Sequence, residues 1–356
     1  MLASNNTPFA AIGFEQWKPD GMKMAVVAAR ASLVLIDDEI RYRDKQELVL
    51  ADVFEGDPHR TPMLKPGDLV PFRPSADVTV IGAIHADEPS TTLRAGISVG
   101  AWQKRLLATG PRHWHHDRGW KLSQVTAVSS VPLDWRLAAG GRIIGDPDGA
   151  VDPRNPIGTG VIHPDYTSTK LEIPAPQIFS DTAPIGPGQT APPPPQGLGP
   201  VSPWWEARSI FAGTYDRAWQ ESHHPLLPRD FDYRFYQVAP SDSRLQGYLY
   251  PGTQIKVQGL LPDSLHLEFS LPDLVPFAKF SFTDGREVLA RLHLDGLHLD
   301  LQMGVQFDLT WRAWAPLCPA LYRIDLELGT TESVSEMDLP VSTLDGLEVD
   351  LDLRQT

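Results

Sequence analysis

The sequence predicts a mainly β protein, built from antiparallel sheets of the sandwich or barrel kind with long irregular connections and few short helices. Pro (34) and Gly (28) are both frequent, which favours turns and short strands over long helices. Many short segments alternate apolar and polar residues between Gly, Pro or Asp-Gly turn signals, as antiparallel strands do. No window predicts a helix longer than about three turns.

Residues 1–183 form the first β-rich region. Residues 24–36 (MAVVAARASLVLI) combine β-branched and small apolar side chains, which predicts a core strand. A loop with three prolines follows at residues 52–69. The later strand candidates of this region alternate between turn signals; they are residues 77–85, 92–99, 102–108 and 124–133.

Residues 184–203 (PIGPGQTAPPPPQGLGPVSP) are rich in Pro and Gly and predict an exposed linker or surface loop. Residues 204–329 form a second β-rich region, and its short strand candidates indicate an antiparallel meander. These candidates are residues 254–260, 264–271, 279–282, 287–292, 296–301, 306–314 and 321–328. The acidic tail, residues 330–356, is expected to pack loosely. The two β regions form either two domains or one body.

Residues 211–249 mix aromatic rings, carboxylates, arginines and prolines more densely than the rest of the chain and show no clean period of 2 or 3.6. Pro225 and Pro228 would interrupt any backbone ladder. We predict an irregular but ordered crossing segment, with its rings buried and its charges paired locally. It is interpreted as a folding element and not as an active site.

The net charge of −14 argues against general nucleic-acid binding, which needs a basic face. The single cysteine, Cys318, excludes an internal disulfide and fits a reducing cytosol. The first residues lack the features of a signal peptide, and the most apolar early run is too short to span a bilayer. A cytoplasmic protein that does not enter a membrane is therefore expected.

Three histidines, His113, His115 and His116, could be metal ligands by residue type, because alternate positions on a strand share one face. A metal-dependent hydrolase that uses this cluster is one alternative function. No second ligand cluster with a recognisable spacing accompanies it, and the sequence has no HEXXH, paired CXXC or EF-hand pattern. We therefore expect no metal and no cofactor.

Enzymatic signatures are missing elsewhere too: neither a GXSXG elbow nor a phosphate-binding glycine loop is present, so no catalytic residue is assigned. Trp204 and Trp205 could stack on a sugar, which makes a carbohydrate-binding module a further alternative. At the end of a proline-rich stretch such rings more often dock that stretch onto the domain.

Several segments of the chain resemble one family: residues 6–9 (NTPF), 26–35 (VVAARASLVL), 68–86 (DLVPFRPSADVTVIGAIHA), 154–158 (RNPIG), 211–219 (FAGTYDRAW), 225–242 (PLLPRDFDYRFYQVAPSD) and 309–313 (LTWRA). By these segments the chain resembles the bacterial domain of unknown function 2169 family, which is found in type VI secretion gene clusters. The motif residues carried over look structural; they are Arg154, Asn155, Pro156, Tyr215, Asp216, Trp219, Pro228, Asp230, Phe231, Asp232, Arg234 and Phe235. The chain departs from the pattern at residues 134–141, where Arg136 and Ala139 replace a glutamate and an aromatic residue, and at His223-His224.

The resemblance implies a cytoplasmic, non-enzymatic adaptor or chaperone. Such a protein would bind a secreted effector toxin, through the toxin's N-terminal segment or through a PAAR-like spike-tip protein, and help to load it onto the VgrG/PAAR spike. No cofactor and no catalytic residue follow from the resemblance. The sequence does not identify the residues that bind the partner.

Overall fold

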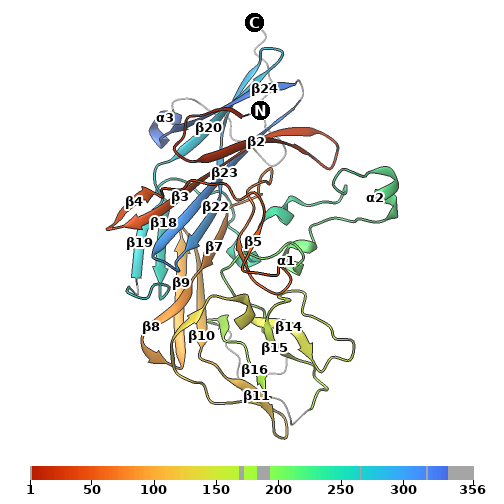
Figure 1. Cartoon of the computed structure of the whole chain (residues 1–356), viewed down its shortest axis with the longest axis vertical. Helices are drawn as coiled ribbons and strands as arrows, with labels where there is room; N and C mark the ends of the chain where they lie inside the picture. Colours follow the sequence, from red (N-terminus) through yellow and green to blue (C-terminus); the bar gives the residue numbers. More distant parts are fainter. Residues whose placement is uncertain (1, 168–171, 183–192, 265, 318–319, 336–356) are drawn as a thin grey trace.

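A six-stranded sheet forms the centre of the molecule, in the order β2-β3-β23-β22-β7 with β4 paired to β3 (Figure 1). The computed structural model describes residues 2–167, 172–182, 193–264, 266–317 and 320–335. The strands of this sheet are β2 (Ala10–Trp17), β3 (Lys23–Ile36), β4 (Glu39–Tyr42), β7 (Asp77–Ile81), β22 (His293–Asp300) and β23 (Val305–Pro316). The core strand predicted at residues 24–36 is β3, which pairs with β23 along nearly its whole length.

One face of this sheet is apolar and packs on a second sheet. Small side chains of β3, such as Ala25, Val27 and Ala29, lie in the main core together with apolar residues of the second sheet. That sheet has the order β17-β10-β9-β18-β19. Its strands are β9 (Thr92–Val99), β10 (Trp102–Thr109), β17 (Ile178–Ser180), β18 (Gln254–Gln258) and β19 (His266–Ser270). Phe269 and Phe307 meet between the two sheets, with ring centroids 5.2 Å apart.

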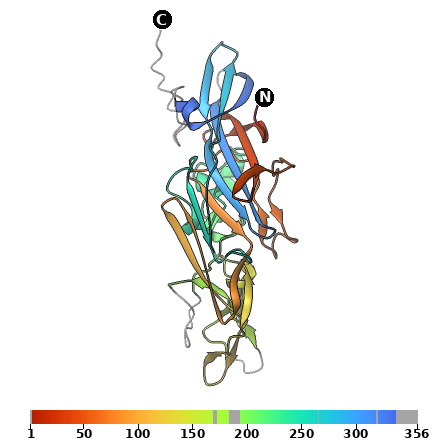
Figure 2. The same ribbon diagram turned by 90° about the vertical axis from the view of Figure 1, so that its left-hand side faces the viewer.

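Smaller sheets extend the molecule at both ends, and the second view shows its elongated shape (Figure 2). One end holds β1 (Leu2–Asn5), β24 (Leu321–Gly329), β20 (Val275–Phe282) and β21 (Glu287–Arg291), followed by α3 (Thr331–Ser335). The other end holds β11 (His113–His116), β12 (Trp120–Leu122), β16 (Ile173–Pro174), β14 (Ala139–Ile144) and β15 (Thr159–Ile162). Two further pairs are β8 (Ala83–Ser90) with β13 (Val128–Pro132), and β5 (Val53–Phe54) with β6 (Met63–Lys65).

The helices are all short. They are α1 (Glu206–Ser209), α2 (Arg217–Ser222) and the 3-10 turns η1 (Trp135–Leu137), η2 (Tyr233–Tyr236) and η3 (Ser241–Ser243), besides α3. Within the described ranges, none is long and apolar enough to cross a membrane. The predicted fold class is confirmed: the protein is mainly β, with several antiparallel sheets, and no sheet among the described strands closes into a barrel.

The two β-rich regions of the sequence share their sheets. In the central sheet, β3 of the first region pairs with β23 of the second, and β7 pairs with β22. In the second sheet, β9 pairs with β18. The predicted meander of residues 254–328 is therefore wrong in its connectivity. The hairpins β18–β19, β20–β21 and β22–β23 form locally, but they belong to three different sheets because distant strands pair with them.

The prediction of an exposed linker at residues 184–203 is wrong for residues 197–202, which are buried. Hydrogen bonds hold this stretch: Val80 N donates to Leu198 O at 2.8 Å, and Val201 N donates to Val238 O at 2.7 Å. Lys104 Nζ donates to Gly197 O at 2.8 Å. Residues 183–192 lie outside the described residues, as do Cys318 and residues 336–356 of the acidic tail. Residues 331–335 form α3, whose Val334 is buried.

Candidate functional site

The second face of the central sheet carries buried ion pairs where an apolar layer would be usual. Arg30 of β3 binds Asp308 of β23 through Nη2 at 2.6 Å, and its Nη1 lies 3.1 Å from Asp68. Ser32 Oγ donates to Asp308 at 2.6 Å. All four side chains are buried. Burying any one of these charges without its partner would destabilise the folded state, so the charges must be paired when the sheet forms.

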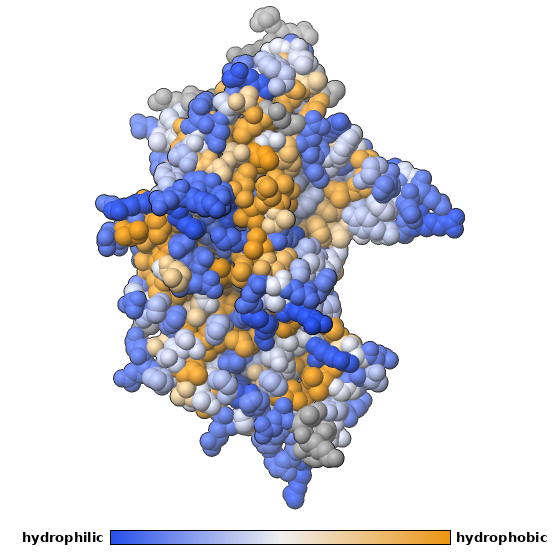
Figure 3. All heavy atoms as spheres, in the orientation of Figure 1, coloured by the Kyte–Doolittle hydropathy of each residue, from blue (hydrophilic) through white to orange (hydrophobic). Residues whose placement is uncertain are grey.

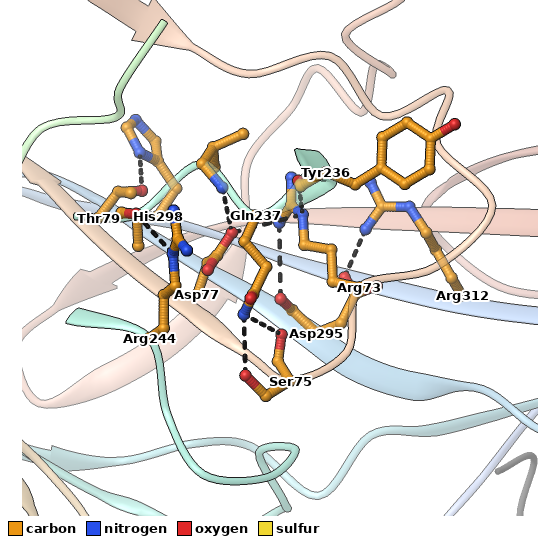
Figure 4. Close-up of polar contacts among 12 residues, drawn as sticks. Arg73, Ser75, Asp77, Thr79, Tyr236, Gln237, Arg244, Asp295, His298 and Arg312 are labelled. Atoms are coloured by element: carbon orange, nitrogen blue, oxygen red, sulfur yellow. Dashed lines mark hydrogen bonds and ion pairs between the residues drawn. The ribbon is translucent and has the colours of Figure 1, made fainter. Parts of the chain in front are cut away.

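The same face continues into the network drawn in Figure 4. Arg312 of β23 donates through Nη1 to the carboxylate of Asp295, and through Nη2 to the backbone carbonyl of Asp68 at 3.0 Å. Arg73 Nε lies 3.5 Å from the Asp77 carboxylate. This carboxylate also accepts a hydrogen bond from the backbone N–H of Val238 at 2.6 Å. These groups come from three parts of the chain: the strands, residues 68–77, and residues 236–244.

Burial shifts the pKa values of the network. It raises the pKa of Asp77, against the opposing charge of Arg73. It lowers the pKa of His298 to about 4, and the ring Nδ1 lies 2.9 Å from Thr79 Oγ1. Burial also lowers the pKa of Arg208 to about 10. Burial thus disfavours the charged forms of Asp77, His298 and Arg208.

Sequence reasoning missed this network, although four of the segments that carry the family resemblance meet in it. They contribute Arg30, Asp68 with Arg73 and Asp77, Val238, and Arg312. The partners are far apart in sequence; Arg30 and Asp308 are separated by 278 positions. One local signal could have pointed to the network: Arg30 stands inside an otherwise apolar strand. A charge that is buried with such a strand needs a partner of opposite charge.

The crossing segment begins with a projecting arm, which we define as residues 211–232. Its base is closed by a hydrogen bond from Asp232 N to Phe211 O at 3.0 Å. Thr214 donates to Asp230 through its backbone N at 3.0 Å and through Oγ1 at 2.7 Å, which ties the two sides together. Helix α2 lies at the outer end and projects away from the body (Figure 1). The Asp216 side chain caps this helix by accepting from Trp219 N at 2.8 Å.

Rings pack on one another along the arm. Tyr215 and Trp219 lie edge to face with centroids 4.7 Å apart, and Trp219 meets His224 at 5.3 Å. Trp219 Nε1 donates to Leu226 O at 2.9 Å. Tyr215 is 54% exposed, so the predicted burial of the rings is wrong here, because the arm has no body beneath its outer half. Phe231 at the inner end is buried, as predicted.

The predicted local charge pairing is confirmed for some residues of the crossing segment. Arg234 pairs with Asp232 at 2.5 Å and lies over the Phe211 ring at 4.2 Å. Asp216 and Asp230 are satisfied by N–H and hydroxyl donors and not by arginines. Pro228 is buried at the inner end of the arm. Arg208 donates to Phe235 O at 2.9 Å, just after the arm.

The loop with Arg154, Asn155 and Pro156 lies close to the base of the arm, since Glu206 N of α1 donates to Pro153 O at 2.8 Å. Asn155 is fully buried and donates to Trp135 O at 2.8 Å, which is a structural role. Pro156 is half-buried in the same loop. Arg154 is held by Asp152 at 2.6 Å and lines a groove of about 420 Å³ at the base of the arm. Three segments of the resemblance therefore meet at this groove.

The residues of the alternative functions lie elsewhere. His113, His115 and His116 are on β11, at the end of the molecule remote from the arm (Figure 1). His116 packs against Trp120 with centroids 5.3 Å apart. In the part of the chain that the structure describes, no group of three or more His, Cys, Asp or Glu side chains is placed to hold a metal ion. The hydrolase alternative therefore gains no support from the geometry.

Trp204 and Trp205 do not offer the open rings that a carbohydrate site needs. Trp205 is buried and meets Trp135 edge to face at 5.3 Å. Trp204 is covered by Phe54 at 5.6 Å and by His59 at 4.6 Å. Both tryptophans dock the chain after residue 203 onto the body. The carbohydrate alternative therefore gains no support from this pair of rings.

The face of the molecule seen in Figure 3 is apolar along its centre, and the arm is hydrophilic toward its tip and more apolar near its base. A family model matches residues 20–312, and its family is described as an uncharacterized protein conserved in bacteria (DUF2169). The match includes the buried network, the arm and the central sheet except β2 and the end of β23. No curated protein and no solved structure matches the chain. The chain belongs to the DUF2169 family of uncharacterized proteins conserved in bacteria.

Proposed function

We propose that this protein is a non-enzymatic adaptor or chaperone, which binds a type VI secretion effector and helps to load it onto the VgrG/PAAR spike. The secretion context is supported by the resemblance of the sequence segments, several of which form the buried network and the arm. The partner is a toxin or a PAAR-like spike-tip protein that carries it.

The projecting arm is the observation that carries this proposal. Its frame is fixed before any partner arrives, by the Asp232–Phe211 and Thr214–Asp230 hydrogen bonds and by the cap of α2. It presents the half-exposed ring of Tyr215 to solvent. Rings held in a preorganised frame are effective anchors, because little conformational freedom remains to be lost on binding.

The negative net charge of the chain supports a partner protein with a positively charged binding segment. The net charge of −14 favours a basic segment on the effector and an association rate that falls with added salt. A chaperone that binds the folded effector stabilises it by mass action, so the effector should be more stable in the complex than alone.

The test is co-expression with the toxin encoded beside this gene, followed by purification through a tag on one partner. A defined complex and loss of toxin secretion on deletion of this gene are the expected results. The variant Tyr215→Ser combined with Trp219→Ala should weaken the complex. Tyr322→Ser is the matched control, because Tyr322 is 62% exposed on β24 at the far end of the molecule. A toxin that is soluble, spike-bound and secreted without this protein would contradict the proposal.

A further inference from the structure

The groove at the base of the arm lies between α1, η3 and residues 194–196. It has a volume of about 420 Å³, and Trp135 and Val201 also line it. Its apolar wall includes Ile210 and Phe211. Ile210 is 66% exposed. The groove is therefore an accessible apolar surface that adjoins the arm.

Arg244 gives the groove its chemical character. Its Nε donates to Ala239 O at 3.1 Å, and its Nη2 donates to Ala207 O at 2.9 Å. The guanidinium lies 5.9 Å from the centre of the Phe211 ring. Among the described residues, no carboxylate lies within ion-pair distance of Arg244, although the charges of Asp77 and Asp232 act on it, and its hydrogen bonds use Nε and Nη2 and leave Nη1 without an acceptor. A partly buried guanidinium with a spare terminal nitrogen is suited to a carboxylate, because charge-assisted hydrogen bonds of this kind are strong.

The other charges around the groove restrict what can bind there. Arg154 is occupied by Asp152 at 2.6 Å. Asp242 is held by Lys104 at 2.6 Å, and its side chain is 51% exposed. Glu206 of α1 also lines the groove and is exposed. These two acids would repel a run of acidic residues, so the groove favours a single carboxylate with apolar neighbours.

We propose that this groove binds an extended segment of the protein partner in which one glutamate or aspartate is flanked by apolar side chains. The carboxylate binds Nη1 of Arg244, and an apolar neighbour packs on Ile210 and Phe211. That the segment belongs to a protein partner rests on the proposed function. The chemistry of the segment is inferred from the groove alone. Basic residues elsewhere in the partner remain compatible with the acidic surface of the chain.

The probe is a pair of fluorescent peptides, acetyl-Lys-Leu-Glu-Leu-Lys-amide and the same peptide with Gln in place of Glu. Binding to the full chain is measured by fluorescence anisotropy. The Glu peptide should bind about tenfold more tightly than the Gln peptide, as expected for one hydrogen-bonded charge pair. Ile210→Asp should abolish binding of the Glu peptide. Met303→Asp is the control, because Met303 is 83% exposed in the turn between β22 and β23, and it should change nothing.

Arg244→Met tests the anchor directly and should remove the discrimination between the two peptides. Arg244 also holds two backbone carbonyls, so this variant can lose stability; Ile210→Asp keeps the proposal falsifiable because its side chain is exposed. Equal binding of the Glu and Gln peptides to the wild-type chain overturns the proposal.

The two proposals fail separately. If the toxin co-purifies equally with the wild-type chain and with Ile210→Asp, and the peptides are not discriminated, the groove inference fails while the adaptor function stands. If the Glu peptide binds selectively but no neighbouring gene product co-purifies, the chemistry of the groove is supported and the proposed function fails.

Discussion

Replacing Arg312 with Met tests whether the buried network holds the irregular part of the chain on the central sheet. The Arg312 side chain is fully buried, and its partner Asp295 is 1% exposed. The substitution keeps most of the aliphatic volume but removes the charge. It leaves the Asp295 carboxylate without its ion-pair partner and takes two donors from the backbone carbonyl of Asp68.

The expected loss of stability is about 3–5 kcal/mol, which is typical when one partner of a buried ion pair is removed. Urea unfolding, followed by tryptophan fluorescence and circular dichroism, measures it. The matched control is Arg217→Met: Arg217 pairs with Glu221 at 2.6 Å, but the side chains are 89% and 61% exposed. This exposed pair should contribute less than about 0.5 kcal/mol.

A double variant, Arg312→Met with Asp295→Leu, separates charge from packing. It removes both charges, so no unpaired ion remains in the interior, and it should recover most of the loss. Hydrogen exchange should show the local effect: residues 68–77 and 231–249 lose protection in the single variant before the strands do. A loss for Arg312→Met no larger than that for Arg217→Met would refute the reasoning.

Three further predictions follow from burial. The folded-state pKa of His298, about 4, lies below its usual 6.5, so between these pH values the unfolded chain takes up a proton that the folded chain refuses. Stability should therefore fall by about 3 kcal/mol from pH 6.5 to pH 4 because of this residue, and His298→Asn should remove that part of the slope in urea titrations. Phe231→Ala should cost about 3–5 kcal/mol, whereas Trp219→Ala, in the projecting arm, should change global stability by less than about 1 kcal/mol; equal losses in thermal melts would place the arm in the core. Proteases should cleave residues 197–202 only after global unfolding, and rapid native cleavage there, seen by mass spectrometry, would contradict their burial.

The strands could be predicted from sequence because their signals are local. Alternation and turn residues located β9, β10 and β18 closely, and the small and β-branched residues of β3 marked the core strand. Which strands pair could not be predicted, because pairing depends on register between distant segments. The parallel pairing of β7 with β22 joins residues more than 200 positions apart and leaves no local pattern.

The exposed linker and the buried arm were predicted wrongly for a related reason. Composition reports what a segment could bury, but not whether another part of the chain is there to cover it. Gly197 has few apolar atoms and is nevertheless buried, because the Trp135 ring packs on it and Lys104 donates to its carbonyl. Tyr215 is a large ring and is nevertheless exposed, because the arm extends beyond the sheets.

The number of buried cations in this fold has a physical explanation. Residues 193–211 and 231–249 cover a sheet without forming strands of their own, so many of their carbonyls have no partner in a regular ladder, and buried carbonyls need donors. Long cationic side chains supply these donors, some from the covering segments themselves and some from neighbouring parts of the chain. They are Arg73 to Tyr236 O, Arg208 to Phe235 O and Val201 O, Arg244 to Ala239 O and Ala207 O, and Lys104 to Gly197 O. A guanidinium suits this role because it offers five N–H groups in a rigid plane, while carboxylates such as Asp77 limit the cost of burying its charge. The base of the arm is fixed by these same bonds, and this is why a segment without regular structure can hold exposed rings in a defined position.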